Sequence, residues 1–497
     1  MALAGLDIGT TGCKCTVMTA GGRILSSRYR EYAASRVAGM HEIDAEVVWE
    51  AAKDVIRSAF SESPESVKSL AVSSFGESCV LLDEQGGVTA PVMLYTDPRG
   101  AAQSERLSAA LGRERIFRLC GHPPNAMYTL PKLMYIQEHK PRLWEKVRFI
   151  LPIHSFIIYR LCGEAVTDYS LASRMMLLDI TKLDWCCELL DAGGIDKALL
   201  PRVTTPGSAA GRILSGIADE LGVSRSLTIA TGCQDQIAAA AGAGALRPGS
   251  AVNGSGTVEC LTPVFDGLPD GLEKMAPSGY AVVPAINGLY VTYAFIFTGG
   301  ALLQWFRDRF AGEAVLRAAQ NGRSAYDYLN DRVRPDPSGL LVLPHFAGAA
   351  TPYMDTASKG AIVGLTLEHD ETDVYRALLE GVAYESRINM ERLESAGIHI
   401  DSLRVTGGGA RSRVWTQIKA DILNRPIEAL ASSEAGAVGS SILSGLAVRE
   451  YMSLDEGMSI VKTRGHFLPR DDRARYDGVY EQYRRLYKAL KSVYGEG

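Results

Sequence analysis

Short apolar runs separated by glycine turns open the chain. Residues 3–8 and 14–20 are two such runs, and residues 9–13 between them contain two glycines and two threonines. A second glycine turn at residues 21–22 leads into the β-rich run of residues 23–32. This alternation predicts a hairpin meander rather than the immediate strand–helix–strand order of a dinucleotide-binding fold.

An amphipathic helix is predicted after the meander. Asp44 stands at the N-cap position of residues 44–60, and the apolar positions that recur at helical spacing are Val47, Val48, Ala51, Val55, Ile56 and Ala59. Residues 67–76 and 79–88 then read as two further strands. The first part of the chain is therefore expected to be a group of antiparallel strands followed by a helix.

A related order of elements recurs near the middle of the chain. Residues 227–246 read as a strand, a turn and an Ala/Gly-rich helix, and residues 250–264 read as a strand, a Gly/Ser/Thr turn and a strand. The segment LDIGTTGCKCTV aligns weakly with VNGSGTVECLTPV, which fits an internal duplication, although glycine hairpins are common enough to arise without one.

The chain has 497 residues, more than one ordinary hydrophobic core holds. A boundary near residues 246–248 gives two domains, 1–246 and 247–497, each of about 250 residues. No long linker or low-complexity segment separates them. We therefore expect the two domains to pack closely around a cleft.

The composition is that of an ordinary globular protein. Hydrophobic residues make up 46% and charged residues 22%, and 52 Lys and Arg against 57 Asp and Glu give a formal charge of −5. This balance gives no reason to expect a nucleic-acid or membrane-surface partner. No window approaches the roughly 20 apolar residues of a membrane span, and no signal peptide is evident. We expect a cytoplasmic protein that acts on a small molecule.

The nine cysteines fit a reducing compartment. Their number is odd, and none forms a CxxC pair matched by a second one or by a histidine pair, so a zinc site is not expected. The adjacent Cys186 and Cys187 are predicted to be a buried pair of thiols rather than part of a disulfide framework.

The turn LDIGTTGCK, residues 6–14, is the first candidate for chemistry. Successive backbone N–H groups of a glycine turn can converge on a phosphate, and threonine hydroxyls add donors. The spacing is not that of a Walker A loop. Taken alone, a tight hairpin whose threonines satisfy their own backbone accounts for the segment at least as well.

The triple glycine in residues 405–428 is a second candidate. A strand leads into Gly407, Gly408 and Gly409, and a helix from about Ser412 carries Val414, Ile418 and Ile422 on one face. Residues without side chains allow a flat ligand such as an adenine ring to approach the backbone. A tight strand-to-helix connection is the alternative.

Several charged residues follow predicted strands. Asp235 lies between a strand and a small-residue helix, where it could be a plain helix cap or a general base. Glu77, and Asp97 with Arg99, also fall just past strands, where polar groups often face a ligand crevice. Each of them alone is more often part of a solvated turn.

Together these segments resemble the FGGY family of carbohydrate kinases, and its xylulokinase-like branch in particular. LDIGTTGCK resembles the family's first phosphate turn, and EIDAEVVWEA its E-x-D-P-E-x-W stretch. Residues 128–141 and 405–423 are similar to the two family signatures. GCQDQIAAAAGAGAL, NGSGTVE and TGGALLQWF lie between them in the expected order. The resemblance covers nearly the whole chain.

The resemblance implies an α/β fold of two ribonuclease-H-like domains of the actin/hexokinase/Hsp70 superfamily, with an interdomain cleft that closes over ATP and a sugar. The first domain would bind the sugar and carry the first phosphate turn, and the second would bind the nucleotide. That superfamily has one phosphate hairpin per domain, which makes the weak internal repeat intelligible. Family members are often dimers, so a homodimer is compatible with the resemblance.

The resemblance also implies a role for each candidate residue. Asp235 would accept the proton of the sugar hydroxyl, and Asp7 and Asp235 would hold Mg²⁺ directly or through water. The residues implied to contact ATP are Thr10, Thr11, Lys14, Gly256, Thr257, Gly300, Gln304, Gly408, Gly409 and Ala410. Those implied for the sugar site are Gly76, Glu77, Asp97, Arg99 and Asp235.

The acceptor is less defined than the reaction. Xylulokinases generally carry Met-His where this chain has Gly76-Glu77, and glycerol kinases carry Arg-Glu, so Glu77 matches but Gly76 lacks the guanidinium. A ketopentose such as xylulose is expected, and glycerol, another polyol, an autoinducer-like compound or an aldonate are alternatives. An ATPase of the superfamily and a non-transferring sugar-binding regulator are the rival functions. Retention of Asp7, Lys14 and Asp235 favours transfer over the regulator.

Overall fold

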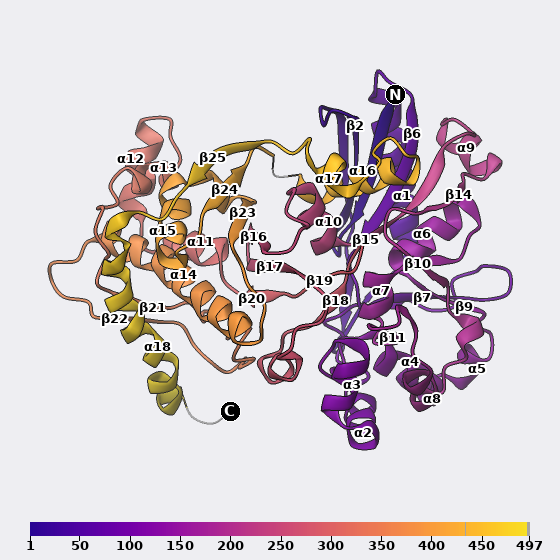
Figure 1. Ribbon diagram of the computed structural model, residues 1–497, viewed down its shortest axis with the longest axis horizontal. Coiled ribbons are helices and arrows are strands. Elements are labelled where there is room, and N and C mark those ends of the chain that lie inside the picture. The colour runs from indigo at the N-terminus through magenta and orange to yellow at the C-terminus, as the bar shows by residue number, and fades with distance from the viewer. Residues whose placement is uncertain (433, 495–497) are drawn as a thin grey trace. The chain divides into compact units, whose positions relative to one another are not determined.

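The computed structural model describes residues 1–432 and 434–494, which form two compact units (Figure 1). The first unit comprises Met1–Leu246, Ala281–Val291 and Glu434–Val461. The second comprises the described residues of Arg247–Tyr280, Thr292–Ser433 and Lys462–Gly497. After residue 246 the chain therefore returns to the first unit twice, at Ala281–Val291 and at Glu434–Val461. A single domain boundary near residue 246 does not describe these two returns. The division of roles between domains 1–246 and 247–497 stays a prediction.

A six-stranded sheet forms the centre of the first unit. Its strands lie in the order β14 (Ala209–Arg212), β15 (Thr228–Gln234), β6 (Val67–Ser74), β1 (Ala2–Ile8), β2 (Gly12–Thr19) and β3 (Ile24–Glu31). The β1–β2–β3 meander is antiparallel, as predicted, whereas β6 runs parallel to β1, and β15 parallel to β6. This order is that of the expected ribonuclease-H-like domain.

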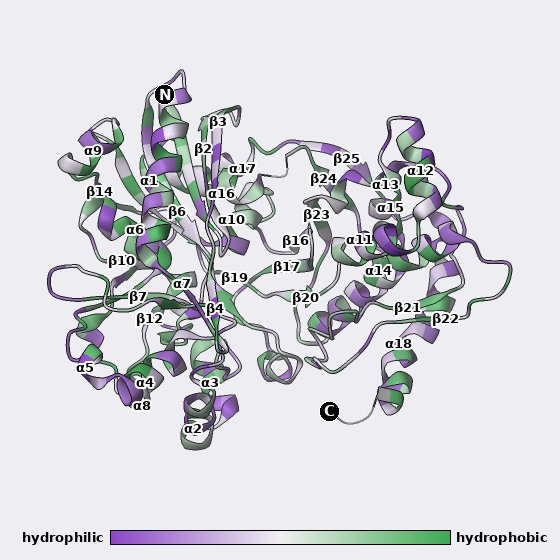
Figure 2. Cartoon of the chain, turned by 180° about the vertical axis from the view of Figure 1, so that it is seen from behind, coloured by the Kyte–Doolittle hydropathy of each residue, from purple (hydrophilic) through white to green (hydrophobic). Residues whose placement is uncertain are grey.

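Helix α1 (Ala45–Glu62) confirms the predicted amphipathic helix. Asp44 is its N-cap and accepts a hydrogen bond from the backbone N–H of Glu46, 2.9 Å away. Its apolar face, with Val48 and Ile56, is buried in the core of the unit. Val47 is the exception, because it is 44% exposed. Green and purple segments alternate along the helices in Figure 2, as expected for elements that bury one face.

Two helices of the first unit pack backbone to backbone. A Cβ at Gly439 of α16 (Ala435–Ala447) would lie 1.8 Å from the carbonyl oxygen of Ala238 in α10 (Asp235–Gly242). A Cβ at Gly242 would lie 1.8 Å from the carbonyl oxygen of Ala435. The Ala/Gly-rich composition of this part of the chain therefore permits a contact that larger side chains would prevent.

The remaining elements of the first unit lie outside this sheet, and several of the strands among them form smaller two- and three-stranded sheets. They are β4 (Ser35–Val37), β5 (Met40–Ile43), β7 (Cys79–Leu82), β8 (Val92–Met93), α2 (Ala101–Leu111), α3 (Arg113–Cys120), α4 (Thr129–His139), α5 (Pro141–Trp144), β9 (Phe149–Pro152), α6 (Ile153–Cys162), β10 (Val166–Asp168), α7 (Tyr169–Arg174), β11 (Leu178–Asp179), β12 (Asp184–Trp185), α8 (Cys187–Gly193), η1 (Lys197–Leu199), β13 (Arg202–Thr204), α9 (Ser215–Leu221), β18 (Val283–Pro284), β19 (Leu289–Val291) and α17 (Leu454–Met458).

The second unit repeats the arrangement of the first. Its sheet contains β20 (Ala294–Ile296), β17 (Glu259–Asp266), β16 (Ser250–Ser255), β23 (Ser402–Thr406), β24 (Ile427–Leu430) and β25 (Thr463–Phe467). β16 is antiparallel to β17 and parallel to β23, which is parallel to β24. The β16–β17 hairpin therefore occupies the same position in the sheet of the second unit as the β1–β2 hairpin occupies in the sheet of the first unit.

Helices cover the sheet of the second unit. They are α11 (Gly300–Arg309), α12 (Gly312–Gln320), α13 (Ala325–Asn330), α14 (Glu371–Ser395), α15 (Arg413–Leu423) and α18 (Ala474–Tyr494), with the short helices η2 (Leu272–Lys274), η3 (Ala276–Ser278), η4 (Gly409–Arg411) and η5 (Asp471–Arg473) and the strands β21 (Leu341–Leu343) and β22 (Ala361–Val363). Ser412 caps α15 by accepting a hydrogen bond from the N–H of Trp415 at 3.1 Å, so the predicted helix start is confirmed.

All nine cysteines are free thiols. Cys186 is buried but Cys187 is exposed, so the predicted buried pair was wrong for Cys187. Cys187 is the first residue of α8, and its side chain lies on the outer side of that helix's first turn. Among the described helices, none combines the length and the apolar character that a membrane span requires.

Candidate active site

Two carboxylates mark one candidate centre in the first unit. Asp7 is the penultimate residue of β1, and Asp235 is the first residue of α10, directly after β15. Burial and, to a lesser extent, the nearby charge of Asp235 raise the pKa of Asp7 to about 7, against the opposing effect of Lys14. Burial raises the pKa of Asp235 to about 6. Titratable groups perturbed in this way are typical of functional sites.

The surroundings of Asp235 stabilise its ionised form. The backbone N–H of Gln236, the charge of Arg174 and the side chain of Gln234 all lower its pKa against the effect of burial. The first position of a helix also places the carboxylate at the positive end of the helix dipole. Asp235 is therefore a carboxylate that is held in place and able to take up a proton near neutral pH.

Asp7 lies against the first turn of a second helix. A Cβ at Gly436 would be 2.7 Å from Oδ2 of Asp7, so only glycine leaves room for the carboxylate there. Gly436 is the second residue of α16, whose N-terminal end favours a negative charge. The two carboxylates thus face the N-terminal ends of the two helices that pack backbone to backbone.

The predicted phosphate turn is a hairpin turn between β1 and β2. The N–H of Gly9 donates to the carbonyl of Gly12 at 2.9 Å, and the hydroxyl of Tyr32 donates to the carbonyl of Gly9 at 2.6 Å. Lys14 pairs with Asp7 in the strand register, and its Nζ lies 2.6 Å from Oε2 of Glu434. Thr10 and Thr11 are at the tip of this turn. Contacts of Thr10, Thr11 and Lys14 with phosphate stay predictions.

An arginine that the sequence reasoning missed lies beside Gly76 and Glu77. Arg174, the last residue of α7, forms a buried ion pair with Glu77 and lies 5.3 Å over the ring of Tyr128. A Cβ at Gly76 would be 2.9 Å from Cβ and 3.0 Å from Cγ of Arg174. Gly76 therefore makes room for the guanidinium that it does not itself provide.

Sequence signals for Arg174 were present but weak. The residue stands in SLASRMMLL, where every other residue is small or apolar. A charged residue in such a run is rarely buried unless it is paired. That pattern could have identified Arg174 as a candidate for a buried ion pair. It does not indicate which residue is the partner, because Glu77 is distant from Arg174 in the sequence.

Lys132 holds the backbone around Glu77. Its Nζ donates to the carbonyl oxygens of Glu77 at 3.3 Å, Leu94 at 2.8 Å and Met127 at 2.7 Å. Glu77 itself has a φ of +63°, a left-handed conformation that is uncommon for a residue other than glycine. Such conformations persist where surrounding contacts enforce them, and they concentrate at functional sites.

Asp97 and Arg99 form a closed ion pair in the same unit. The guanidinium of Arg99 donates to Oδ1 of Asp97 at 2.8 Å and to Oδ2 at 2.7 Å, and it also pairs with Glu42. The N–H of His41 donates to Oδ2 at 2.7 Å. These contacts occupy both carboxylate oxygens, and they hold the pKa of Asp97 below its usual value despite its burial. Contact of either residue with a substrate stays a prediction.

A larger pocket of about 740 Å³ lies in the second unit. Six of the residues predicted to contact ATP line it: Gly256, Thr257, Gly300, Gln304, Gly408 and Gly409. Ala410 instead lines a neighbouring smaller cavity. The volume is within the range of pockets that hold small organic ligands. The nucleotide role of these residues stays a prediction, but the structure brings the six together.

Glycine is required at several points of this pocket. A Cβ at Gly300 would be 2.6 Å from the carbonyl oxygen of Gly256, whose hairpin turn docks on the start of α11. Gly407, next to the lining Gly408, has a φ of +86°, and a Cβ at Gly409 would be 2.5 Å from the ring of Trp415. Around Gly408 no atom lies within 4 Å of the added Cβ. The backbone at Gly408 is therefore open to close approach by a ligand.

Side chains from α13 and from the N-cap of α15 complete the pocket, and the sequence reasoning did not place them there. Tyr326, Asn330 and Ser412 line it. Oδ1 of Asn330 accepts hydrogen bonds from the hydroxyls of Tyr375 at 3.1 Å and Ser412 at 3.2 Å, which joins the two helices. No motif marks α13, so only the three-dimensional structure brings it to the pocket.

The carboxylate pair suits Mg²⁺ better than a metal held by protein ligands alone. Among the described residues there is no group of three or more His, Cys, Asp or Glu that could hold a metal. Asp7 and Asp235 offer oxygen ligands, and the charge of Asp235 raises the pKa of Asp7, a repulsion that a cation would relieve. Mg²⁺ typically binds one or two carboxylates together with waters and substrate phosphates.

Comparison with known proteins identifies similar chains along the whole length. The family model "FGGY family of carbohydrate kinases, N-terminal domain" matches residues 2–242, and the corresponding C-terminal model matches residues 268–448. The chain is 27% identical to the xylulose kinase of Escherichia coli, with 98% of each chain covered. It is 29% identical to the glycerol kinase of Thermococcus gammatolerans, covering 98% of this chain and 96% of the relative.

Solved structures are similar over the same extent. The crystal structure of xylulose kinase from Rhodospirillum rubrum has a TM-score of 0.87 at 25% identity, covering 99% of this chain and 100% of the other. Relatives with different acceptors in their names thus resemble the chain to a similar degree. Overall similarity supports the reaction class but does not separate the acceptors.

Proposed function

We propose that this chain, which belongs to the FGGY family of carbohydrate kinases, transfers the terminal phosphoryl group of ATP to a hydroxyl of a neutral polyhydroxy compound, with Asp235 as the general base. Members of this family are phosphotransferases that use ATP and act on sugar hydroxyls. The base, the metal ligands and the acceptor are the parts that we add as a proposal.

The observation that carries the proposal is the setting of Asp235. Its pKa of about 6 leaves it ionised at neutral pH yet basic enough to accept a proton as one is released. The Glu77–Arg174 pair supplies a carboxylate and a guanidinium in the same unit, and Arg174 is near enough to lower the pKa of Asp235. A base with hydroxyl-binding groups around it suits proton removal from a sugar hydroxyl.

Transfer follows from these groups. The acceptor oxygen attacks the γ-phosphorus of ATP while its proton passes to a carboxylate oxygen of Asp235. The bond between that phosphorus and the β–γ bridging oxygen breaks, and ADP leaves with the electron pair. Mg²⁺ held by Asp7 and Asp235 would neutralise charge on the phosphates. The protein otherwise contributes position, through donors aimed at the phosphates and acceptors aimed at the sugar.

The Glu77–Arg174 pair favours an uncharged acceptor. A carboxylate accepts hydrogen bonds from hydroxyls and a guanidinium donates them, so the pair can bind two hydroxyls of one molecule. Because the two charges cancel, an anionic acceptor such as an aldonate gains attraction from Arg174 but suffers repulsion from Glu77. We therefore favour a ketopentose such as xylulose, with glycerol or another polyol as the second candidate.

A coupled assay of ADP release over a panel of ketopentoses, polyols and aldonates tests the proposal. We expect release that requires both an acceptor and Mg²⁺, with neutral ketopentoses or polyols preferred. Release without an acceptor would instead indicate an ATPase, and no release with any acceptor would indicate a sugar-binding regulator. A preference for aldonates would contradict the role given to Glu77.

We also propose a cytoplasmic location. Nine free thiols, five of them in the hydrophobic cores of the first unit, fit a reducing compartment.

A further inference from the structure

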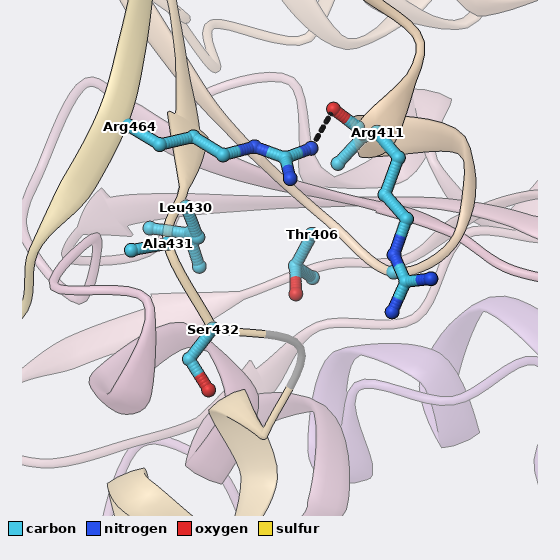
Figure 3. A pocket seen from close by; sticks show the side chains of 8 residues that line it. Thr406, Arg411, Leu430, Ala431, Ser432 and Arg464 are labelled. Carbon is cyan, nitrogen blue, oxygen red and sulfur yellow. Dashed lines mark hydrogen bonds between the residues drawn. The ribbon is translucent and has the colours of Figure 1, made fainter. Parts of the chain in front are cut away.

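A second cavity in the second unit lies outside the groups assigned to transfer. It has a volume of about 130 Å³ and lies where the parallel strands β23 and β24 end. Side chains from the strands β23, β24 and β25, from the short helix η4 and from the segment after β24 surround it, among them Thr406, Arg411, Leu430, Ser432 and Arg464 (Figure 3). The carboxyl ends of parallel strands are common ligand sites in α/β sheets.

The cavity is positively charged. The guanidinium groups of Arg411 and Arg464 border it, and none of the described residues that line it is acidic. Since one water takes up about 30 Å³ of liquid volume, the space is large enough for a tetrahedral oxyanion. Arginine is well suited to bind such an anion, because its planar fork donates two hydrogen bonds at once.

A buried hydroxyl points into this cavity. Thr406 is only 8% exposed, and its Oγ1 has no hydrogen-bond partner among the described residues. Figure 3 shows Thr406 between the two arginines, with the hydroxyl of Ser432 across from it. A buried donor without a partner is costly, so it indicates a ligand oxygen that accepts from it.

One wall of the cavity is shared with the larger pocket. Arg464 donates a hydrogen bond to the carbonyl oxygen of Ala410 in η4, and Arg411 of the same short helix lines both spaces (Figure 3). A ligand in either space therefore competes for the guanidinium of Arg411. Such sharing makes binding at the two sites interdependent.

We propose that this cavity binds a small oxyanion, inorganic phosphate or the phosphate group of a phosphomonoester, and that this anion weakens nucleotide binding in the larger pocket by a limited factor. The effect is limited because, among the described residues, only Arg411 lines both spaces, whereas Thr406 and Arg464 line the small cavity and not the larger pocket. The proposed coupling rests on the nucleotide role of the larger pocket. The anion site itself does not depend on phosphoryl transfer.

Calorimetric titration of the full chain with inorganic phosphate, at constant ionic strength, tests the site. We expect saturable binding that weakens about tenfold or more in Arg464→Gln, because a charge-assisted hydrogen-bond donor is lost. Thr406→Val keeps the shape of the side chain and should weaken phosphate binding several-fold while leaving the affinity for the ATP analogue AMP-PNP unchanged. Arg404→Gln, on the same strand but outside both spaces, is the matched control and should bind phosphate as the parent does.

The source of the anion is decided in the same experiment. Titration with glycerol 3-phosphate, with glycerol as the uncharged control, shows whether a phosphomonoester binds more tightly than phosphate. Saturable binding supports the site whichever of the two anions binds more tightly. Absence of saturable binding by both anions, or an equal loss in Arg404→Gln, overturns it.

Titration with AMP-PNP at rising phosphate separates coupling from direct competition. We expect the apparent Kd of AMP-PNP to rise and then level off, as two coupled sites require. A rise without limit would place phosphate in the nucleotide pocket and overturn the proposal. Because none of these measurements uses turnover, they stand whether or not the chain proves to be a kinase.

Discussion

At Asp235, burial and a nearby cation act on one carboxylate in opposite directions. Burial raises its pKa, while the guanidinium of Arg174 lowers it, and the result of about 6 suits a base that works near neutral pH. The same guanidinium pairs with Glu77, in the place that Gly76 leaves open. At the scale of single residues, the proposed acceptor site therefore depends on the positive charge of Arg174 in α7, and not on one in the loop after β6.

Moving that guanidinium tests its role in acceptor binding. Arg174→Gly should lower kcat/KM for the acceptor about 10- to 100-fold, mostly through KM, because hydrogen bonds to a charged group are lost. Adding Gly76→Arg to this variant should restore part of the loss, since a Cβ at position 76 no longer meets the Arg174 side chain. Steady-state kinetics of the three proteins provide the comparison.

The affinity for AMP-PNP is the control for this series, because its proposed pocket lies in the other unit. If Arg174→Gly leaves the acceptor KM unchanged, Arg174 does not bind the acceptor. If the double variant is no better than Arg174→Gly, a guanidinium in this place is not what the acceptor requires.

At the scale of elements, three helices position the candidate groups of the first unit. α10 presents Asp235, α16 presents Gly436 to Asp7, and α7 presents Arg174. The backbone contact of α10 and α16 depends on Gly242 and Gly439, which fix how closely the two helices approach each other. The positions of the carboxylates thus follow from the packing of small residues.

Gly439→Ala should disturb this packing. The added Cβ would lie 1.8 Å from the carbonyl oxygen of Ala238, so the helices must separate, at a cost of about 1–3 kcal/mol in unfolding free energy, with a fall in kcat. Gly216→Ala in α9 is the matched control, because nothing lies within 4 Å of its added Cβ, and it should be neutral or slightly stabilising. Chemical denaturation and steady-state kinetics of both variants provide the comparison. If Gly439→Ala and Gly216→Ala change the unfolding free energy and kcat equally, the packing argument is wrong.

The start of α7 gives a prediction on pH. Asp168 caps the helix, and burial raises the pKa of its side chain to about 7 from a usual value of 3.8. A carboxyl whose folded pKa is raised contributes stability that is complete below about pH 4 and is lost as the pH rises through 7. Asp168→Asn removes this dependence.

The thermal midpoint of Asp168→Asn minus that of the parent should therefore increase as the pH rises from 4 to 8. The difference is the quantity to compare, because other titrating groups affect both proteins alike. A difference that stays constant or decreases over this range would contradict the raised pKa.

Local elements were predictable from the sequence, and long-range contacts were not. The β1–β2–β3 meander, the Asp44 cap and the Ser412 cap each depend on residues close together in the chain, so their patterns predicted them. The ion pair of Arg174 and Glu77 joins residues that are distant in sequence, and the sequence around either residue does not indicate the other as its partner. The exposure of Cys187 likewise depends on how its helix packs, which local composition does not determine.

At the scale of the whole molecule, two units repeat one strand order. Each has an antiparallel hairpin next to two parallel strands, with a glycine turn at the hairpin. The sequence indicated the repeat only weakly, because Gly/Thr turns are common, and the topology makes the relation plain. The first unit holds the carboxylates and the Glu77–Arg174 pair, whereas the second holds the pocket of about 740 Å³.

This division predicts where each ligand protects the backbone. In hydrogen–deuterium exchange, the acceptor alone should slow exchange in residues 74–78 and 169–176. AMP-PNP alone should slow exchange in residues 254–258 and 407–412, which surround the larger pocket. Protection of the first set by AMP-PNP and of the second by the acceptor would reverse the roles proposed for the two units.

The central claim is that Asp235 removes the proton from the acceptor hydroxyl. The most direct measurement is the single-turnover rate of phosphoryl transfer in the parent and in Asp235→Asn, with the affinity for AMP-PNP measured alongside. The account predicts a fall of about 10²- to 10⁴-fold in the rate, with nucleotide affinity unchanged, because a general base contributes about this much. Transfer by Asp235→Asn at the rate of the parent would contradict it.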